Sequence, residues 1–168
     1  MSELLLIGGR SGVGKTSVGY EIHAQLARLD VKHCLIEGDN LDQAHPPPWE
    51  HSLAERNLAA MWTNYRAIGY QRMIYTNTAS VRVVDELTTA MGDNPRVTAV
   101  LLTATDATAR HRLSGREIGS ALEWHVERSN LVARELDEVT PEWVHRVATD
   151  GRGVTDIARE VIGLTTWA

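Results

Sequence analysis

The segment Gly9-Arg10-Ser11-Gly12-Val13-Gly14-Lys15-Thr16 decides the fold of this 168-residue chain. It matches the pattern G-x-x-x-x-G-K-[ST], the Walker A motif. The apolar run Leu4-Leu5-Leu6-Ile7 precedes it and is typical of a buried strand, and a helical pattern follows over residues 16–29. A strand before the motif and a helix after it favour a phosphate-binding loop over an ordinary glycine-rich turn.

Each part of this loop has a role in holding a nucleoside triphosphate. Backbone N–H groups of a glycine-rich turn converge on an anion, and the helix N-terminus adds the positive end of its dipole. Lys15 reaches the β- and γ-phosphates, and Thr16 offers its hydroxyl to Mg²⁺. The sequence therefore predicts ATP and Mg²⁺ as cofactors. The residues expected to bind the nucleotide here are Gly9, Ser11, Gly12, Val13, Gly14, Lys15, Thr16 and Ser17.

The composition is that of one ordinary globular domain. The chain is 43% apolar and 23% charged, and its length suits a single core. The net charge of -5 argues against a nucleic-acid partner, which needs a basic surface. Cys34 is the single cysteine, which excludes an intrachain disulfide and fits a reducing cytoplasm. We expect no signal peptide, no membrane span, and a cytoplasmic monomer or homodimer.

Strand and helix patterns alternate along the chain, which is typical of a parallel sheet covered on both faces. Strands are predicted at residues 3–8, 33–37, 72–76, 97–102 and 144–148. Helices are predicted at residues 16–29, 52–71, 80–91, 107–136 and 154–164, with a break near 115–120 and Ser80 as a plausible cap. The predicted fold is an α/β P-loop NTPase domain with a five-stranded, mainly parallel sheet and a helical lid at about residues 114–136.

Several classes of protein share the Walker A loop. A GTPase needs an Asn-Lys-x-Asp motif, which this sequence lacks. A motor-type ATPase needs a longer chain and a strand that ends in acidic residues. The run Val83-Val84-Asp85-Glu86 resembles such an ending, but the apolar residues around it recur at helical spacing, which favours a helix with solvated acids. The class that remains is the small-molecule and nucleotide kinases.

Asp39 follows the second predicted strand in the run Glu37-Gly38-Asp39-Asn40, at the edge of the sheet where the phosphate loop opens. A carboxylate there accepts the proton of a substrate hydroxyl or holds Mg²⁺ through water. Glu37 shares its strand face but is expected to lie deeper. The strand ending resembles those of adenylyl-sulfate kinases and gluconate kinases, and chloramphenicol phosphotransferase has a similar Asp. The resemblance implies that Asp39 is a catalytic and substrate-positioning residue.

Two segments after Asp39 are candidates for the acceptor site. Ala54-Glu55-Arg56-Asn57-Leu58 resembles the substrate helix of adenylyl-sulfate kinases, which implies substrate binding by Asn57. The family's Arg three residues before that Asn is Ala54 here, so Arg56 would act from another helix face. The stiff segment His45-Pro46-Pro47-Pro48-Trp49 either walls the acceptor pocket, with Trp49 stacked on a ring, or forms a rigid surface turn.

Arginines after the fourth and fifth strands are candidates for contacts with the phosphates and the base. P-loop kinases carry arginines on a helix and lid after the fourth strand, where they neutralise charge on the transferring group. We predict a catalytic role for Arg116 and nucleotide binding by Arg110, the alternative being a solvated face paired with glutamates. Gly151 and Gly153 permit close approach of the backbone to an adenine, on which Arg152 is predicted to stack.

These features predict an ATP-dependent kinase that transfers the γ-phosphoryl group to a hydroxyl of a small molecule. The acceptors considered are, in descending order, an antibiotic or other metabolite, a nucleoside or nucleotide, and adenylyl sulfate. The alternative is a nucleotide-binding regulatory or sensor ATPase without a dedicated acceptor. The pair Asp39 and Arg116 favours the enzyme, because a sensor does not need them.

Overall fold

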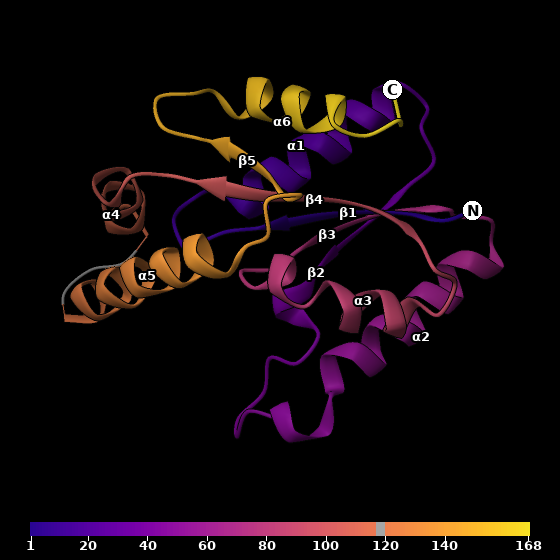
Figure 1. The fold of residues 1–168 in the computed structure, drawn as a ribbon, viewed down its shortest axis with the longest axis horizontal. Coiled ribbons are helices and arrows are strands. Elements are labelled where there is room, and N and C mark those ends of the chain that lie inside the picture. The colour runs from indigo at the N-terminus through magenta and orange to yellow at the C-terminus, as the bar shows by residue number, and fades with distance from the viewer. Residues whose placement is uncertain (117–119) are drawn as a thin grey trace.

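A five-stranded sheet forms the centre of the protein (Figure 1). The structure, a computed structural model, describes residues 1–116 and 120–168. The strands are β1 (Glu3–Gly8), β2 (Cys34–Glu37), β3 (Arg72–Thr76), β4 (Arg96–Thr103) and β5 (His145–Ala148). Their order is β2-β3-β1-β4-β5, and every neighbouring pair is parallel. The predicted α/β fold is confirmed, with a sheet that is wholly rather than mainly parallel.

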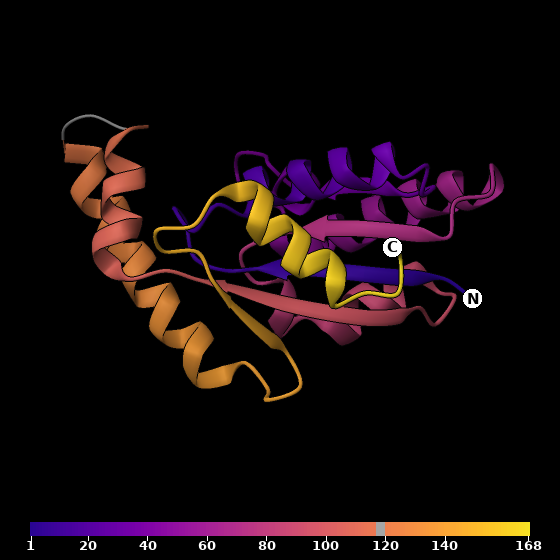
Figure 2. The same ribbon diagram turned by 90° about the horizontal axis from the view of Figure 1, so that it is seen from above.

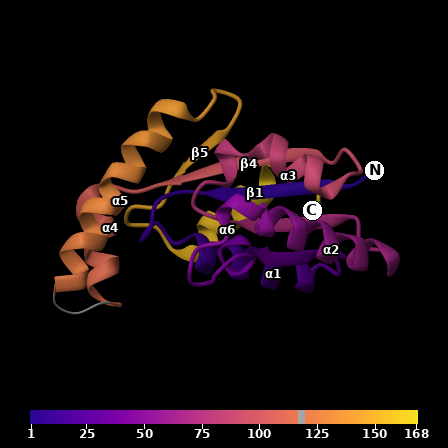
Figure 3. The same ribbon diagram turned by 90° about the horizontal axis from the view of Figure 1, so that it is seen from below.

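Helices cover both faces of the sheet and one of its ends. α1 (Lys15–Arg28) and α6 (Val154–Gly163) lie side by side on one face, as Figure 2 shows from above. α2 (Leu53–Ala67) and α3 (Val84–Met91) cover the other face, seen from below in Figure 3. α4 (Asp106–Ser114) and α5 (Ser120–Val139) lie beyond the carboxyl ends of the strands, and both termini lie at the opposite end (Figure 1). The strand ends therefore face α4 and α5.

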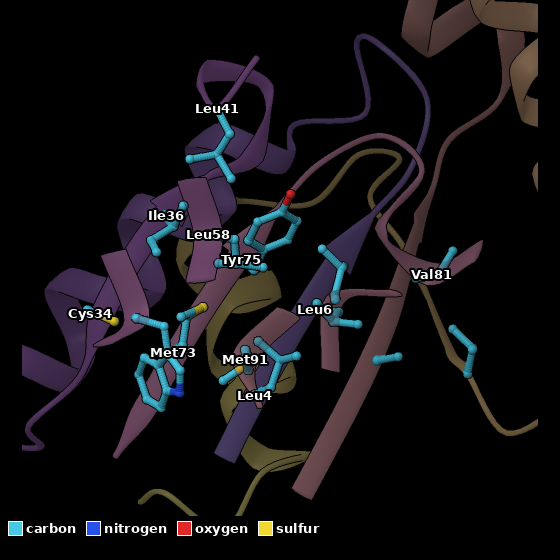
Figure 4. Packing of buried hydrophobic residues seen from close by; sticks show 14 of the residues in the cluster. Leu4, Leu6, Cys34, Ile36, Leu41, Leu58, Met73, Tyr75, Val81 and Met91 are labelled. Carbon is cyan, nitrogen blue, oxygen red and sulfur yellow. The ribbon is translucent and has the colours of Figure 1, made fainter. Parts of the chain in front are cut away.

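Two hydrophobic cores hold these layers together. Successive side chains of β1 point to opposite faces, so Leu4 and Leu6 join one core and Leu5 and Ile7 the other. The first core includes Leu58 and Trp62 of α2 and Tyr75 of β3 (Figure 4). The second includes residues of α1 and α6. A strand buried on both faces is a continuous apolar run, which is why the sequence predicts β1 so clearly.

The segment predicted as one helix over residues 80–91 differs in the structure. It forms a 3-10 turn, Ser80–Arg82, followed by α3 after Val83. Ser80 is fully buried and does not cap α3. The 3-10 turn instead packs against the end of β1, so closely that a Cβ at Gly8 would lie 3.0 Å from Val81. The helical interpretation of residues 83–86 is confirmed, and Asp85 and Glu86 are exposed in the first turn of α3.

Two other boundaries concern the second helix and the lid. α2 ends at Ala67 rather than at residue 71, and Gly69 after it has φ +87°. The predicted break at 115–120 falls partly on residues 117–119, outside the described residues. No helix in the described part of the chain is long and apolar enough to cross a membrane.

Candidate active site

The phosphate loop leaves β1 and turns into α1 at the carboxyl edge of the sheet. Gly12 and Gly14 have φ values of +83° and +100°, a left-handed backbone that other residues rarely adopt. A Cβ at Gly12 would lie 2.8 Å from the Ala109 carbonyl oxygen, so α4 packs directly against the loop. Gly14 is the N-cap residue of α1, and a Cβ there would meet no atom within 4 Å. The N-terminus of α1 is therefore open to an anion.

Arg10 anchors the back of the phosphate loop to the helices beyond it. Its side chain is 3% exposed, and its Nε donates to Ser129 Oγ at 2.9 Å. Its two other nitrogens donate to Asp106 and Asn130. The Ser129 hydroxyl donates in turn to the Ser11 carbonyl oxygen at 2.8 Å. A buried polar network whose members are all paired favours one position of α5 against the loop.

Arg112 of α4 joins the phosphate loop to the segment after β5. One of its terminal nitrogens donates to the carbonyl oxygens of Gly12 and Val13 at 3.3 and 3.1 Å, and to Thr149 Oγ1 at 2.9 Å. The other donates to the Thr149 carbonyl oxygen at 2.9 Å. The two loops are therefore held at a fixed separation by one guanidinium.

Neither Arg10 nor Arg112 was singled out from the sequence. Arg10 occupies a variable position of the Walker A motif, so the motif carries no signal for it. The helical pattern could have indicated Arg112, because Arg112 lies beside Ala109 and Leu113, the buried residues of α4. That face turns toward the phosphate loop, whereas Arg110 is on the outer side.

Lys15 lies among the charged residues predicted for catalysis. Its Nζ donates to the Arg10 carbonyl oxygen at 3.0 Å. Burial lowers the pKa of Lys15 from 10.5 to about 8, with Asp39 and Glu37 acting to raise it and Arg116 to lower it. The ammonium group is thus within electrostatic range of both predicted catalytic partners, Asp39 and Arg116.

The lowered pKa of Lys15 predicts that ATP binding weakens at alkaline pH. A triphosphate binds the charged ammonium, which in the free protein is lost as the pH rises through about 8. Affinity for an ATP analogue should be steady from pH 7 to 7.5 and then fall by up to about tenfold per pH unit. Calorimetric titration measures this, and Lys15→Arg, which stays charged, is the control. A flat profile for the unmodified protein, or an equal slope in Lys15→Arg, would exclude Lys15 as the titrating group.

Thr16 and Glu37 form the part of the site that fits a hydrated Mg²⁺. Thr16 Oγ1 lies 3.4 Å from Glu37 Oε2. Glu37 Oε1 is buried without a hydrogen-bond partner among the described residues. A buried unpaired carboxylate oxygen is costly, and Mg²⁺ prefers oxygen ligands and keeps several of its waters. Glu37 lies deeper than the exposed Asp39, as expected from the sequence, and its buried oxygen makes it a further candidate for the metal site.

Asp39 is held at the end of β2 by Asn77, which follows β3. Asn77 Nδ2 donates to Asp39 Oδ1 at 2.7 Å, and Asn77 Oδ1 accepts from the Ala79 backbone N–H at 2.9 Å. β2 and β3 are neighbours with Glu37 opposite Thr76, so the residues that follow the two strands meet. Asn77 was not predicted, because its role depends on that strand order.

Gly38 has a side chain of the core directly behind it. A Cβ at Gly38 would lie 2.4 Å from the Tyr75 hydroxyl oxygen and 2.5 Å from Tyr75 Cζ. Tyr75 is 3% exposed and packed in the core, so it has little room to move. Only glycine fits between Tyr75 and the turn that carries Asp39.

Gly38→Ala is therefore expected to destabilise the protein and to displace Asp39. Forcing a methyl group into a packed site lowers the free energy of unfolding by about 1–3 kcal/mol. Gly163→Ala is the matched control, because a Cβ there would meet no atom within 4 Å. Urea unfolding of the two variants measures the difference. Equal stability of the two would mean that Tyr75 yields and that the close approach is not a constraint.

A cavity of about 310 Å³ opens beside the phosphate loop, and it contains two of the predicted arginines. Its lining includes Gly12, Val13, Gly14, Ser17, Arg112, Arg116, Thr149 and Arg152. Arg152 donates to the Ala148 carbonyl oxygen at 2.9 Å and pairs with Glu160. Arg110 is not among the lining residues and pairs with Glu123 of α5. Contact of these arginines with a nucleotide stays a prediction.

The residues predicted to bind the acceptor have other contacts as well. Asn57 Nδ2 donates to the Leu41 carbonyl oxygen at 2.6 Å, which fastens the segment after β2 to α2. Arg56 lines a shallow hollow between α2 and α3 together with Asp85. Trp49 is 74% exposed in a 3-10 turn, Trp49–His51, before α2. Their contact with a substrate stays a prediction, as does direct binding of Mg²⁺ by Asp39.

No family model matches this sequence, and no curated protein matches it at a significant level. Solved structures do match. The tunicamycin resistance protein of Deinococcus radiodurans is 18% identical with a TM-score of 0.69, over 100% of this chain and 98% of that one. A gluconokinase from Sinorhizobium meliloti is 19% identical with a TM-score of 0.62, over 96% and 90%. The APS kinase of Mycobacterium tuberculosis, in complex with AMPPNP and APS, is 17% identical with a TM-score of 0.59, over 97% and 96%.

These similarities extend over nearly the whole length of each pair of chains. They agree with the resemblance to adenylyl-sulfate kinases and gluconate kinases that the sequence shows around the Walker A loop and Asp39. At such low identity they establish the fold and leave the reaction to be argued from the site. The chain has the fold of the P-loop kinases of small molecules.

Proposed function

We propose that this protein is an ATP-dependent kinase that phosphorylates a hydroxyl of a small molecule. The observation that carries the proposal is the arrangement around the phosphate loop: Thr16 contacts Glu37, Asn77 holds Asp39 at the neighbouring strand end, and Arg116 lines the cavity beside the loop. A phosphate-binding lysine, a carboxylate at the next strand end and an arginine from beyond β4 are the groups that phosphoryl transfer requires. A sensor that only binds ATP needs the lysine but neither of the other two.

Each group has one task in the proposed reaction. The phosphate loop and Lys15 hold the β- and γ-phosphates, and Arg116 neutralises charge that develops on the transferring group. Thr16, and through water Glu37 and Asp39, would hold Mg²⁺, which when bound would add positive charge beside the β- and γ-phosphates. Asp39 orients the acceptor hydroxyl and takes its proton while the acceptor oxygen bonds to the γ-phosphorus. The bond from the γ-phosphorus to the bridging oxygen breaks, and ADP leaves.

The nucleotide and the acceptor are supported to different degrees. A nucleoside triphosphate is favoured by the complete Walker A loop, and ATP in particular by the lack of an Asn-Lys-x-Asp motif in the sequence and by the AMPPNP complex of the similar APS kinase. The similar proteins are named for different acceptors or, in one case, for tunicamycin resistance, so they favour no single acceptor for this protein. An antibiotic or other metabolite and a nucleoside remain the leading candidates.

The test is a screen of ATP consumption over alcohol-bearing metabolites, with the mass of each product determined. We expect at least one acceptor to raise consumption well above the basal rate and to gain one phosphoryl group. ATP binding with slow hydrolysis that no acceptor stimulates would favour the alternative, a regulatory or sensor ATPase.

A further inference from the structure

A second cavity of about 310 Å³ lies across the phosphate loop from the one that contains Arg116 and Arg152. The first cavity reaches Thr149 after β5, whereas the second reaches Thr78 after β3. β1 lies between β3 and β5 in the sheet, so the loop that follows β1 separates the two cavities. A kinase of a small molecule needs two such sites, one for each substrate, with the transferring phosphate between them.

The second cavity is joined to Asp39 through the segment after β3. The Thr78 carbonyl oxygen accepts from the Gly9 backbone N–H at 3.2 Å, so this segment runs along the phosphate loop. Asn77, the residue before Thr78, donates to Asp39 Oδ1 at 2.7 Å. α5 forms the opposite wall of the cavity. The cavity therefore lies between α5 and the edge of the sheet that carries the proposed base.

Arg128 of α5 supplies a positive charge to the lining of this cavity. Its guanidinium lies 5.6 Å from the centre of the Trp124 ring, one helical turn away. Stacking on an aromatic ring orders a guanidinium and leaves the N–H groups along its edge free to bind a ligand. Among residues 1–116 and 120–168, no carboxylate pairs with Arg128, whereas Arg110 of α4 pairs with Glu123. The charge of Arg128 is therefore open to a bound molecule.

The rest of the lining favours an anion with an apolar or ring-shaped body. No carboxylate is among the described residues that line the cavity. The His125 ring lies beside Trp124, with ring centres 4.9 Å apart, and adds a second basic side chain. Leu113 and Val132 add apolar surface. A cation without an opposing acid attracts negative charge, and the indole and the aliphatic side chains suit the uncharged part of the same molecule.

We propose that this cavity binds the phosphoryl acceptor, and that the acceptor is an alcohol that carries a carboxylate. The edge of the Arg128 guanidinium matches a carboxylate with two parallel hydrogen bonds. The body of the acceptor lies against Trp124, and its hydroxyl is directed to the side of Asp39. This inference rests on the proposed function and narrows its acceptor to acidic alcohols. It makes Arg128 a specificity-determining residue.

The first test measures binding without turnover, with molecules that share one skeleton and differ in charge. One set is mandelate, 1-phenyl-1,2-ethanediol and 2-amino-1-phenylethanol, and the other is gluconate, sorbitol and glucamine. Each is titrated into protein saturated with AMPPNP and Mg²⁺, and the reporter is the indole N–H signal of Trp124 in NMR spectra, assigned by its loss in Trp124→Phe.

We expect at least one acid to shift the Trp124 signal and to bind about tenfold or more tightly than its neutral counterpart, and the amines not to bind. Equal affinity of acids and neutral compounds, tighter binding of the amines, or no binding of either acid overturns the inference.

Variants of two arginines on α5 locate the carboxylate. Arg128→Gln should weaken binding of the acid about tenfold, and Arg128→Lys, which keeps the charge but lacks the two-nitrogen edge, should weaken it less. Arg134→Gln is the matched control, because Arg134 is exposed on the same helix and does not line the cavity. Affinity for AMPPNP should be the same in all three variants. Unchanged binding of the acid by Arg128→Gln would place the carboxylate elsewhere and contradict the inference.

Kinetics with the acceptor found by the screen separate this inference from the proposed function. Arg128→Gln should raise the KM for the acceptor about tenfold and leave the KM for ATP unchanged. Transfer to a neutral or cationic acceptor, with a KM that Arg128→Gln does not alter, would overturn this inference and leave the proposed function standing. Failure of every acceptor to gain a phosphoryl group would instead overturn the proposed function, and this inference with it.

Discussion

Lys15→Ala is expected to remove most ATP affinity or turnover while the fold stays intact. Loss of one positioned charge that holds a transferring group lowers the rate by about two to three orders of magnitude. Stability should be unchanged, because the ammonium makes one hydrogen bond, to the Arg10 carbonyl oxygen, and its burial disfavours its charged form. The measurements are calorimetric titration with AMPPNP and thermal unfolding.

Lys32→Ala is the matched control for this variant, because Lys15 and Lys32 are the two lysines of the chain. Lys32 is exposed, and its Nζ donates to the Ile68 carbonyl oxygen, away from the phosphate loop. We expect normal nucleotide binding in that variant. Unchanged ATP binding and turnover in Lys15→Ala would contradict the assignment of the phosphate loop.

Asp39→Asn is expected to separate nucleotide binding from catalysis. The substitution keeps the size of the side chain, and its amide oxygen can still accept the hydrogen bond from Asn77 Nδ2, so the turn after β2 should keep its conformation. The negative charge that takes the acceptor proton is lost. Turnover should fall by about two orders of magnitude or more, the usual scale for a positioned base.

The measurement for Asp39→Asn is kcat with the acceptor found by screening, beside the affinity for AMPPNP. Asp30→Asn is the control, an exposed carboxylate after α1 with φ +56°, a conformation that asparagine tolerates. It should leave both quantities unchanged. Near-normal turnover in Asp39→Asn would mean that Asp39 is only a turn residue and that the base lies elsewhere.

The parts of the site that the sequence predicts are those that are contiguous along the chain. β1, the phosphate loop and α1 follow one another, so apolar patterning and one motif were sufficient to predict them. Asp39 was found because the carboxyl ends of parallel strands share one edge of a sheet. Arg116 and Arg152 were predicted instead from the segments that P-loop kinases carry after the fourth and fifth strands, and both line the cavity beside the phosphate loop.

The parts that were missed depend on contacts between distant segments. The bond between Asp39 and Asn77 requires β3 to lie beside β2, and alternation of strands and helices does not fix that order. Arg10 pairs with residues almost 120 positions away, and no local pattern carries that information. Ser80 was expected to cap a helix, but packing of residues 80–82 against β1 prevails over the local capping preference.

The most direct test of phosphoryl transfer follows the γ-phosphate itself. ATP labelled with ¹⁸O on its γ-phosphoryl oxygens is incubated with the protein, Mg²⁺ and each acceptor that raises ATP consumption, and the products are analysed by mass spectrometry. We predict that the label appears in a phosphorylated acceptor, in step with ADP formation, and that Asp39→Asn suppresses it. Label found in inorganic phosphate alone would mean that water is the acceptor and would contradict the assignment as a kinase.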